Sequence, residues 1–331
     1  MKHQSSIKPK VFVLTVLASL CSQAWSQSEQ KVEAPIVTIN TAVGLGTAKM
    51  NLSSTQTGTK GLNKQSTKTK GVILNAAVMG ATATLDMASV NGGISGTNQQ
   101  SAHVLGGVIN GAALGANAQA QIASVGGAVK GSNKQKAVIP GLVLNAAALS
   151  ANAKTRIAST GKGVQFGSND QSVKSLLVIN GAGLTADATV RLASVGGSVK
   201  GRNKQTANIG AVVNAAGLMA SAEVNVASVE GSVSGSNTQR AYVGGVFNGA
   251  GLGAVANVNI ASVAGSVRGV NKQTAFVGGV ANAAALGGLA EVNIASRKGS
   301  VVGGNSQTSF VGGVANFSGF GIPSIININS Y

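Results

Sequence analysis

Eight copies of the motif Asn-x-Gln form one series between residues 63 and 307, and their spacing hardly changes along the chain. Successive motifs lie 34 to 36 residues apart, and a second series of asparagines keeps the same spacing. The motifs begin at Asn63, Asn98, Asn133, Asn169, Asn203, Asn237, Asn271 and Asn305, and the second series comprises Asn40, Asn75, Asn110, Asn145, Asn180, Asn214, Asn248, Asn282 and Asn316. Such regularity indicates a repeat protein, in which each unit buries its apolar side chains against its neighbours.

Residues 267–277 illustrate the local pattern of one unit, with the sequence V-R-G-V-N-K-Q-T-A-F-V. Every second residue of this stretch, including Asn271 and Gln273, is nearly fixed among the units, whereas the residues between them vary. An alternation of period two is typical of a β-strand with one constrained face and one free face. The segment therefore predicts a strand whose asparagine and glutamine point inward.

A second alternating segment lies at residues 290–296, where Val292 and Ile294 match aliphatic residues in the other units. The residues between them change freely in charge, as Lys154 and Arg156 do in an earlier unit. We expect these variable positions to face solvent, because charged side chains are rarely buried.

The chain is rich in glycine, which opposes helix and supplies turns, with 47 Gly against only 4 Pro. Two or three short strands joined by such turns would complete one coil in a unit of this length. We therefore predict an all-β fold, a β-solenoid that resembles a parallel β-helix, with about 8.5 units of 34–35 residues. Equivalent residues would stack about 4.8 Å apart from one coil to the next.

Buried side-chain amides need hydrogen-bond partners, and in a stack each amide can bond to its copies in the coils above and below. The predicted ladder residues are the eight asparagines of the motif together with Gln65, Gln100, Gln135, Gln171, Gln205, Gln239, Gln273 and Gln307. A third candidate ladder comprises Ser89, Ser124, Ser159, Ser194, Ser228, Ser262, Ser296 and Ser330. The opposing interpretation is that asparagine and glycine merely serve turns.

The beginning of the chain reads as a secretory signal peptide over residues 1–26, with a basic start and a short apolar core. No cysteine follows Cys21, so the mature chain would fold without disulfides. We expect a leader at residues 27–35, a β-repeat domain at residues 36–331 and a C-terminal cap at residues 313–331. Pro35 and Pro323 are placed to blunt the open edges of the sheets, because proline cannot donate a backbone hydrogen bond.

The chain is strongly basic, with a formal net charge of +17. Seven basic residues occupy variable, outward-facing positions in alternate units: Lys130, Lys134, Lys200, Arg202, Lys204, Arg268 and Lys272. Stacking would align them into a stripe that can bind a polyanion such as polysaccharide, lipopolysaccharide or DNA. The alternative interpretation is that these charges only keep a glycine-rich β protein soluble.

The sequence carries no recognisable catalytic or metal-binding pattern. His103 is the only histidine beyond the signal segment, so neither a Ser-His-Asp triad nor a Cys/His metal site can be assembled. Carboxylates are few and scattered, without a repeated pair. We therefore expect a protein that is not an enzyme and uses no cofactor or metal.

The recurring pattern Gly-x-Asn-x-Gln-x-Ala, as at residues 131–137 and 269–275, resembles the Asn/Gln/Gly repeats of bacterial functional amyloid subunits. Those subunits form the curli and Fap fibres of biofilm matrices. The resemblance covers about residues 36–331, although the 34-residue unit and the eight-fold count depart from both families. It implies assembly into fibres through the stacking of sheet edges.

Two functions are compatible with these features. The first is a secreted structural protein that associates with itself as the subunit of an extracellular, amyloid-like fibre or biofilm matrix. The alternative is a monomeric adhesin on the outer surface of a bacterium, which binds anionic glycans or extracellular DNA through the basic stripe.

Overall fold

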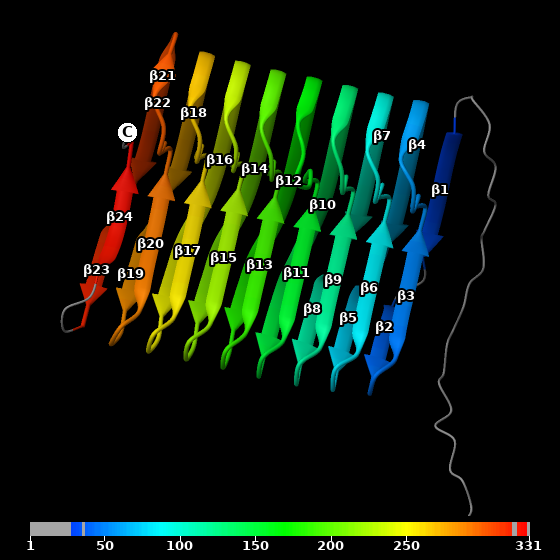
Figure 1. Ribbon diagram of the computed structural model, residues 1–331, viewed down its shortest axis with the longest axis horizontal. Helices are drawn as coiled ribbons and strands as arrows, with labels where there is room; N and C mark the ends of the chain where they lie inside the picture. Colours follow the sequence, from blue (N-terminus) through cyan, green and yellow to red (C-terminus); the bar gives the residue numbers. More distant parts are fainter. Residues whose placement is uncertain (1–27, 35–36, 320–322, 330–331) are drawn as a thin grey trace, which may run out of the picture.

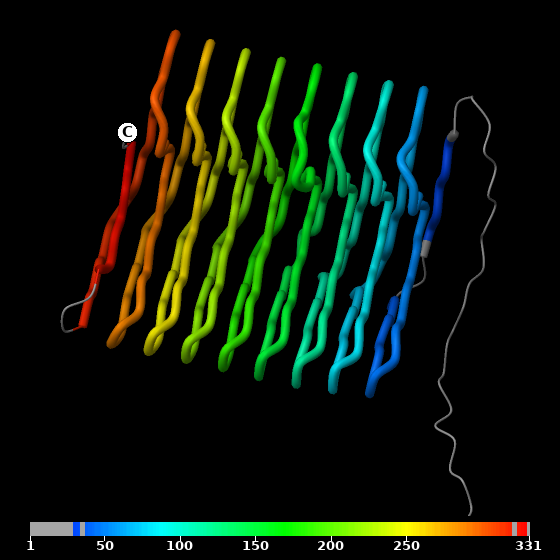
Figure 2. Tube along the Cα trace, viewed as in Figure 1, coloured from blue at the N-terminus to red at the C-terminus, as the bar shows by residue number. Residues whose placement is uncertain are grey.

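The computed structural model describes residues 28–34, 37–319 and 323–329, which form 24 strands and no helix. The predicted signal peptide, Pro35 and Ser330 lie outside the described residues. The chain winds as one repeated coil, and the coils stack side by side from the N-terminal to the C-terminal end (Figures 1 and 2). The predicted β-solenoid is therefore confirmed.

The larger of two sheets has 15 parallel strands, and its first arm is built from the Asn-x-Gln segments together with the N-terminal strand that pairs with the first of them. These strands are β1 (Ser28–Ala34), β4 (Thr59–Thr69), β7 (Ile94–Val104), β10 (Val129–Ala148), β12 (Gln165–Ala182), β14 (Val199–Ala216), β16 (Val233–Ala250), β18 (Val267–Val277), β21 (Val301–Val302) and β22 (Asn305–Val311). In β10, β12, β14 and β16 the strand continues past a bend into the second arm.

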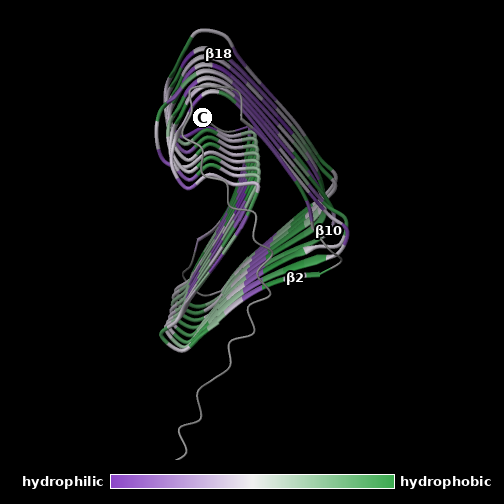
Figure 3. Ribbon diagram, turned by 90° about the vertical axis from the view of Figure 1, so that its right-hand side faces the viewer, coloured by the Kyte–Doolittle hydropathy of each residue, from purple (hydrophilic) through white to green (hydrophobic). Residues whose placement is uncertain are grey.

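The second arm of the larger sheet carries the second asparagine series. Where it is not continuous with the first arm, it consists of β2 (Val37–Val43), β5 (Val72–Val78), β8 (Val108–Ala113), β19 (Val280–Ala284) and β23 (Val314–Ser318). Figure 3 looks along the stack and shows the two arms meeting at an angle, with the second arm markedly more hydrophobic.

The smaller sheet has 9 parallel strands, one from each coil. They are β3 (Thr47–Leu52), β6 (Thr82–Met87), β9 (Asn117–Ile122), β11 (Asn152–Ile157), β13 (Asp187–Leu192), β15 (Ser221–Val226), β17 (Val255–Ile260), β20 (Leu289–Ile294) and β24 (Ser324–Ile328). Each coil thus contributes both arms of the larger sheet and one strand of the smaller sheet.

Neighbouring coils pair in register, so that equivalent residues stack. Asn203 pairs with Asn237 and Gln205 with Gln239, as the spacing of the motifs predicts. Valine, isoleucine and leucine fill most of the core. A separate apolar cluster between the second arm and the smaller sheet, however, consists only of alanine, for example Ala147 and Ala153. Small side chains allow the two sheets to approach closely there.

One glycine of each unit is required by the close approach of the coils. Gly201 adopts a φ of 124°, a conformation that side chains disfavour. A Cβ added to Gly201 would lie 2.3 Å from the carbonyl oxygen of Gly167 in the preceding coil. Both constraints recur at this position from Gly96 to Gly303, which explains the fixed glycine two residues before each asparagine.

The sheets extend almost to both ends of the described chain. Strand β1 lies within residues 27–35, which we expected to precede the repeats, and its Gln30 pairs in register with Gln65. The larger sheet therefore begins at Ser28 rather than at residue 36. At the other end, β23 and β24, which lie within the expected cap at residues 313–331, continue the two sheets, and the exposed Pro323 directly precedes β24.

Candidate functional site

The asparagines of the Asn-x-Gln motif form a hydrogen-bonded column in the interior. Each Nδ2 donates to the Oδ1 of the next coil, at 2.7 Å between Asn63 and Asn98 and at 2.8 Å between Asn203 and Asn237. The chain of bonds is unbroken from Asn63 to Asn305. All members are buried except Asn305, which lies at the open end of the stack.

The glutamines form a second column of opposite polarity, because each Nε2 donates to the preceding coil. Gln205 donates to Gln171 Oε1 at 3.1 Å and also to the carbonyl oxygen of Ser228 at 3.0 Å. The column runs from Gln65 to Gln307. Gln30 occupies the same column one coil earlier, although the sequence alone did not identify it.

The second asparagine series also bonds from coil to coil, and in addition it joins the two sheets. Asn110 Nδ2 donates to Asn145 Oδ1 at 2.7 Å and to the carbonyl oxygens of Ala118 and Lys154 in the smaller sheet. These residues were recognised as periodic but were not included among the predicted ladder residues. Their hydrogen bonds link the second arm to the smaller sheet beside the alanine-lined part of the core.

The serine column is periodic, but its hydroxyls bond mainly to the backbone. Ser159 Oγ donates to the carbonyl oxygens of Ile157 and Arg191 and accepts from the backbone N–H of Ser194. The hydroxyls thus satisfy backbone groups where the chain leaves the smaller sheet.

All seven residues of the predicted basic stripe are exposed on the outer side of the first arm. The register places Asp170 between Lys134 and Lys204, and Phe166 between Lys130 and Lys200. Lys200 Nζ lies 5.4 Å from the centre of the Phe166 ring. Since equivalent cations recur in every second coil, they are separated by about 9.6 Å, close to the Debye length at physiological ionic strength.

A groove follows the border of this stripe. Its lining combines serine hydroxyls, such as those of Ser232 and Ser266, with the side chains of Lys200 and Arg268. Hydroxyls beside cations are suited to sulfate, phosphate or carboxylate groups. The groove therefore adds hydrogen-bond donors to the charge of the stripe.

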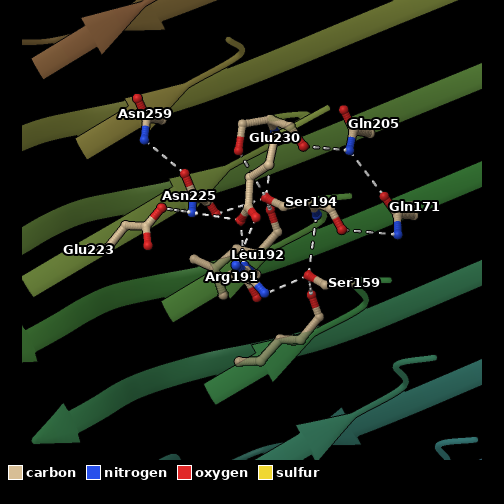
Figure 4. Close-up of polar contacts among 12 residues, drawn as sticks. Ser159, Gln171, Arg191, Leu192, Ser194, Gln205, Glu223, Asn225, Glu230 and Asn259 are labelled. Atoms are coloured by element: carbon tan, nitrogen blue, oxygen red, sulfur yellow. Dashed lines mark hydrogen bonds and ion pairs between the residues drawn. The ribbon is translucent and has the colours of Figure 1, made fainter. Parts of the chain in front are cut away.

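The outer face of the smaller sheet differs from our expectation. Arg191 is only 5% exposed and Asn225 only 1%, although these variable positions were predicted to face solvent. The chain that follows each strand folds back over this face, so that Gly196 and Glu230 lie beside Arg191. Figure 4 shows the resulting network of Arg191, Glu230 and Asn225.

Within this network, Glu230 neutralises Arg191. Arg191 Nη2 donates to Glu230 Oε2 at 2.8 Å, and Nε lies 2.6 Å from Oε1 without hydrogen-bond geometry. Burial raises the pKa of Glu230, and the charge of Arg191 opposes that rise. Asn225 Nδ2 also donates to Glu230, at 3.2 Å.

Arg156 occupies the same column one coil earlier but forms no ion pair within the part of the chain that the structure describes. Its buried Nε has no hydrogen-bond partner among the described residues. Burial and the neighbouring Arg191 lower the pKa of Arg156, and burial together with Arg156 lowers the pKa of Lys154 to about 8. The coils around residue 156 therefore hold an excess of positive charge.

Aromatic residues near the C-terminal end form a short outer column. The rings of Tyr242 and Phe276 are stacked with centres 5.1 Å apart, and those of Phe276 and Phe310 with centres 5.0 Å apart. Phe317 is exposed on the last coil. His103 belongs to the same column as Tyr242, several coils earlier.

No protein-family model, no curated protein and no solved structure matches this chain. Within residues 28–34, 37–319 and 323–329, no helix is long and apolar enough to cross a membrane. The same part of the chain brings together no group of three His, Cys, Asp or Glu side chains that could hold a metal ion.

Proposed function

We propose that the chain is an exported structural subunit that lengthens by stacking head to tail into an extracellular fibre. The observation that carries this proposal is the pair of open strand edges at the two ends of the solenoid. The basic and apolar start of the chain, the lack of later cysteines and the resemblance to functional amyloid repeats support the same conclusion.

Among the described residues, each end of the stack presents strands that are paired on one side only. At the N-terminal end, β1, β2 and β3 pair with β4, β5 and β6, and at the C-terminal end β22, β23 and β24 pair with β18, β19 and β20. Unpaired parallel strands are templates for another chain. Since every coil has the same course, the last coil of one copy matches the first coil of the next.

The polarity of the amide columns also fits head-to-tail stacking. In the second asparagine series each side-chain amide donates toward the C-terminal end, as Asn40 does to Asn75 and Asn282 does to Asn316. The Asn316 amide group of one copy can therefore donate to Asn40 Oδ1 of the copy that follows. The glutamine column runs in the opposite direction, and Gln30 of the following copy can donate to Gln307 Oε1. The junction would thus continue both columns without a change of direction.

The substitution Ser309→Pro tests the proposal at the open edge. Asn271 N–H donates to the next coil and Gly312 N–H to the preceding coil, so alternation along the strand directs the N–H of Ser309 toward the open end. Proline removes that donor and leaves the bonds to β18 in place. The matched control is Ser309→Ala, because alanine occupies this column at Ala275.

We expect the parent and Ser309→Ala to form fibres visible by electron microscopy, with an axial repeat of about 4.8 Å in fibre diffraction. Ser309→Pro should remain as short rods with unchanged far-ultraviolet circular dichroism. Fibres of equal number and length from the proline variant would refute head-to-tail growth through this edge.

The second candidate is an adhesin that binds polyanions through the basic stripe, and it is favoured by the exposed cations and the serine-lined groove. Replacing Lys200, Arg202 and Lys204 by glutamine should remove salt-sensitive retention on heparin or DNA columns, because counterion release drives such binding. The control variant replaces Lys49, Lys70 and Lys162, which are exposed outside the stripe. Equal retention of both variants would show that only net charge matters.

A further inference from the structure

The outer side of the second arm forms a continuous apolar face along the whole stack. Its central column consists of Ile39, Leu74, Ile109, Leu144, Ile179, Val213, Phe247, Ala281 and Ala315, which stack in register from coil to coil. We call this surface the apolar face. Figure 3 shows the second arm as the most hydrophobic part of the coil.

The apolar face is exposed and uncharged. Ile39 and Phe247 are each 57% exposed, and the other members of the central column are half-buried between their neighbours in the stack. None of the outward-facing positions of the second arm, from Val37 to Gly319, holds Lys, Arg, Asp or Glu, although the chain as a whole has a formal net charge of +17. The adjoining turns add exposed side chains such as Leu114, Leu184 and Leu252.

A row of small residues runs beside the central column. Ala76, Gly111, Ala146, Gly181, Ala215 and Gly249 stack in register. A Cβ added to Gly111, Gly181 or Gly249 would meet no atom within 4 Å. The fold itself therefore does not require glycine there, and glycine in a strand lowers stability. A row of glycine and alanine on an open surface instead suits the close approach of another backbone.

We infer that two copies of this chain pair face to face through the apolar face. The bulky column of each copy would lie in the small-residue row of the other, as side chains do between packed sheets. Only another β-sheet carries side chains at the same spacing of about 4.8 Å along the stack. The absence of charge on this face keeps the cations of two strongly basic chains out of the contact, so that their repulsion is screened by the intervening solvent and salt.

The size of the apolar face is sufficient for a stable pair. The second arm contributes seven residues in β2, and the stack has 9 coils. With strands about 4.8 Å apart and residues about 3.3 Å apart, the face covers roughly 900 Å². Stable dimers bury about 800 Å² on each partner, whereas exposed apolar patches on monomers rarely exceed about 600 Å².

Pairing is best measured in the Ser309→Pro background, which separates it from growth at the ends. The first variant, Leu74→Lys, Leu144→Lys and Val213→Lys, places charges on alternate coils of the central column. The second variant, Gly111→Val, Gly181→Val and Gly249→Val, fills the small-residue row but keeps it apolar. The control adds the same charge to the first arm through Thr97→Lys, Ser168→Lys and Thr274→Lys.

We expect sedimentation equilibrium to give a dimer for the parent and the control, and a monomer for both face variants. Circular dichroism should show the same β content in all four proteins. A monomeric parent, or a dimer in either face variant, would overturn the inference. Flotation with phosphatidylcholine vesicles tests whether the apolar face binds a membrane instead of a second copy. If it does, the parent and the valine variant should float with the vesicles alike, and that outcome would also overturn pairing.

Discussion

Substituting one asparagine in the middle of the buried column measures how strongly the ladder holds the coils together. Asn203 is 1% exposed, accepts a hydrogen bond from Asn169 Nδ2 at 2.9 Å and donates to Asn237 Oδ1 at 2.8 Å. Leucine has nearly the same size but can neither donate nor accept. Asn203→Leu would therefore leave a buried donor on Asn169 and a buried acceptor on Asn237.

Each buried polar group that loses its partner costs about 1–3 kcal/mol, which gives about 2–6 kcal/mol for the two groups together. The apolar surface that leucine buries would offset about 1–2 kcal/mol of this loss. We therefore expect the free energy of unfolding to fall by about 1–4 kcal/mol. Lys204→Leu, one residue along the strand on the exposed side, should change it by less than about 0.5 kcal/mol.

Urea unfolding followed by far-ultraviolet circular dichroism gives the free energies, and amide hydrogen exchange locates the loss along the stack. Exchange should accelerate most in β12, β14 and β16, because each coil of a repeat protein is stabilised by its neighbours. Asn271→Leu should cost less, since only β22 and the last coil lie beyond it. Equal losses for Asn203→Leu and Lys204→Leu would refute the assignment of the column as a stabilising ladder.

Three further predictions concern single positions. Gly201→Ala should cost more than about 2 kcal/mol because its Cβ would lie 2.3 Å from Gly167 O at a φ of 124°, whereas Gly111→Ala should be nearly neutral in the same urea titration. Burial raises the pKa of Asp86 above 3.8, and hydrogen bonds from Asn91 and Gln56 partly oppose this rise. The stability that the Asp86 carboxyl group contributes is therefore present below pH 3.8 and is lost as the pH rises through its pKa in the folded state. Asp86→Asn should abolish that loss in unfolding curves recorded across this pH range. Arg156→Gln should leave thermal stability unchanged or higher, because the Arg156 guanidinium has a buried Nε without a hydrogen-bond partner among the described residues. Arg191→Gln should lower the free energy of unfolding by about 1–3 kcal/mol, because Glu230 would keep a buried charge without its counterion. A larger loss for Arg156→Gln than for Arg191→Gln would contradict the proposed charge balance.

Much of the fold follows from the sequence because the repeated unit alternates with period two. The alternation at residues 267–277 identifies the strand, and the constant spacing of Asn203 and Asn237 identifies its parallel neighbour. Gln30 was missed as a member of its column because Ser28 stands where the motif requires asparagine. Without the complete motif, a single glutamine in a short strand is not a recognisable repeat.

The buried network around Arg191 could not be read from the sequence. Alternation in β13 correctly places Arg191 on the side opposite Leu192, but it does not tell whether that side is covered. The covering chain carries glycine at Gly126, Gly161 and Gly196, and glycine leaves no pattern of inward and outward positions. The matching of long side chains on the sheet to glycine on the turn becomes visible only in three dimensions.

The opposite directions of the amide columns have a consequence for the electrostatics of a long stack. Both asparagine columns of the larger sheet point their donors toward the C-terminal end, whereas the glutamine column and the column of Asn259, Asn293 and Asn327 point theirs toward the N-terminal end. Aligned amide dipoles add along an axis, as they do in a helix, and antiparallel ones cancel. From Asn225 to Asn327 the stack therefore has two columns in each direction and little net side-chain dipole. In the earlier coils one asparagine column is left unopposed, so each rod keeps a modest side-chain dipole that points its donors toward the C-terminal end.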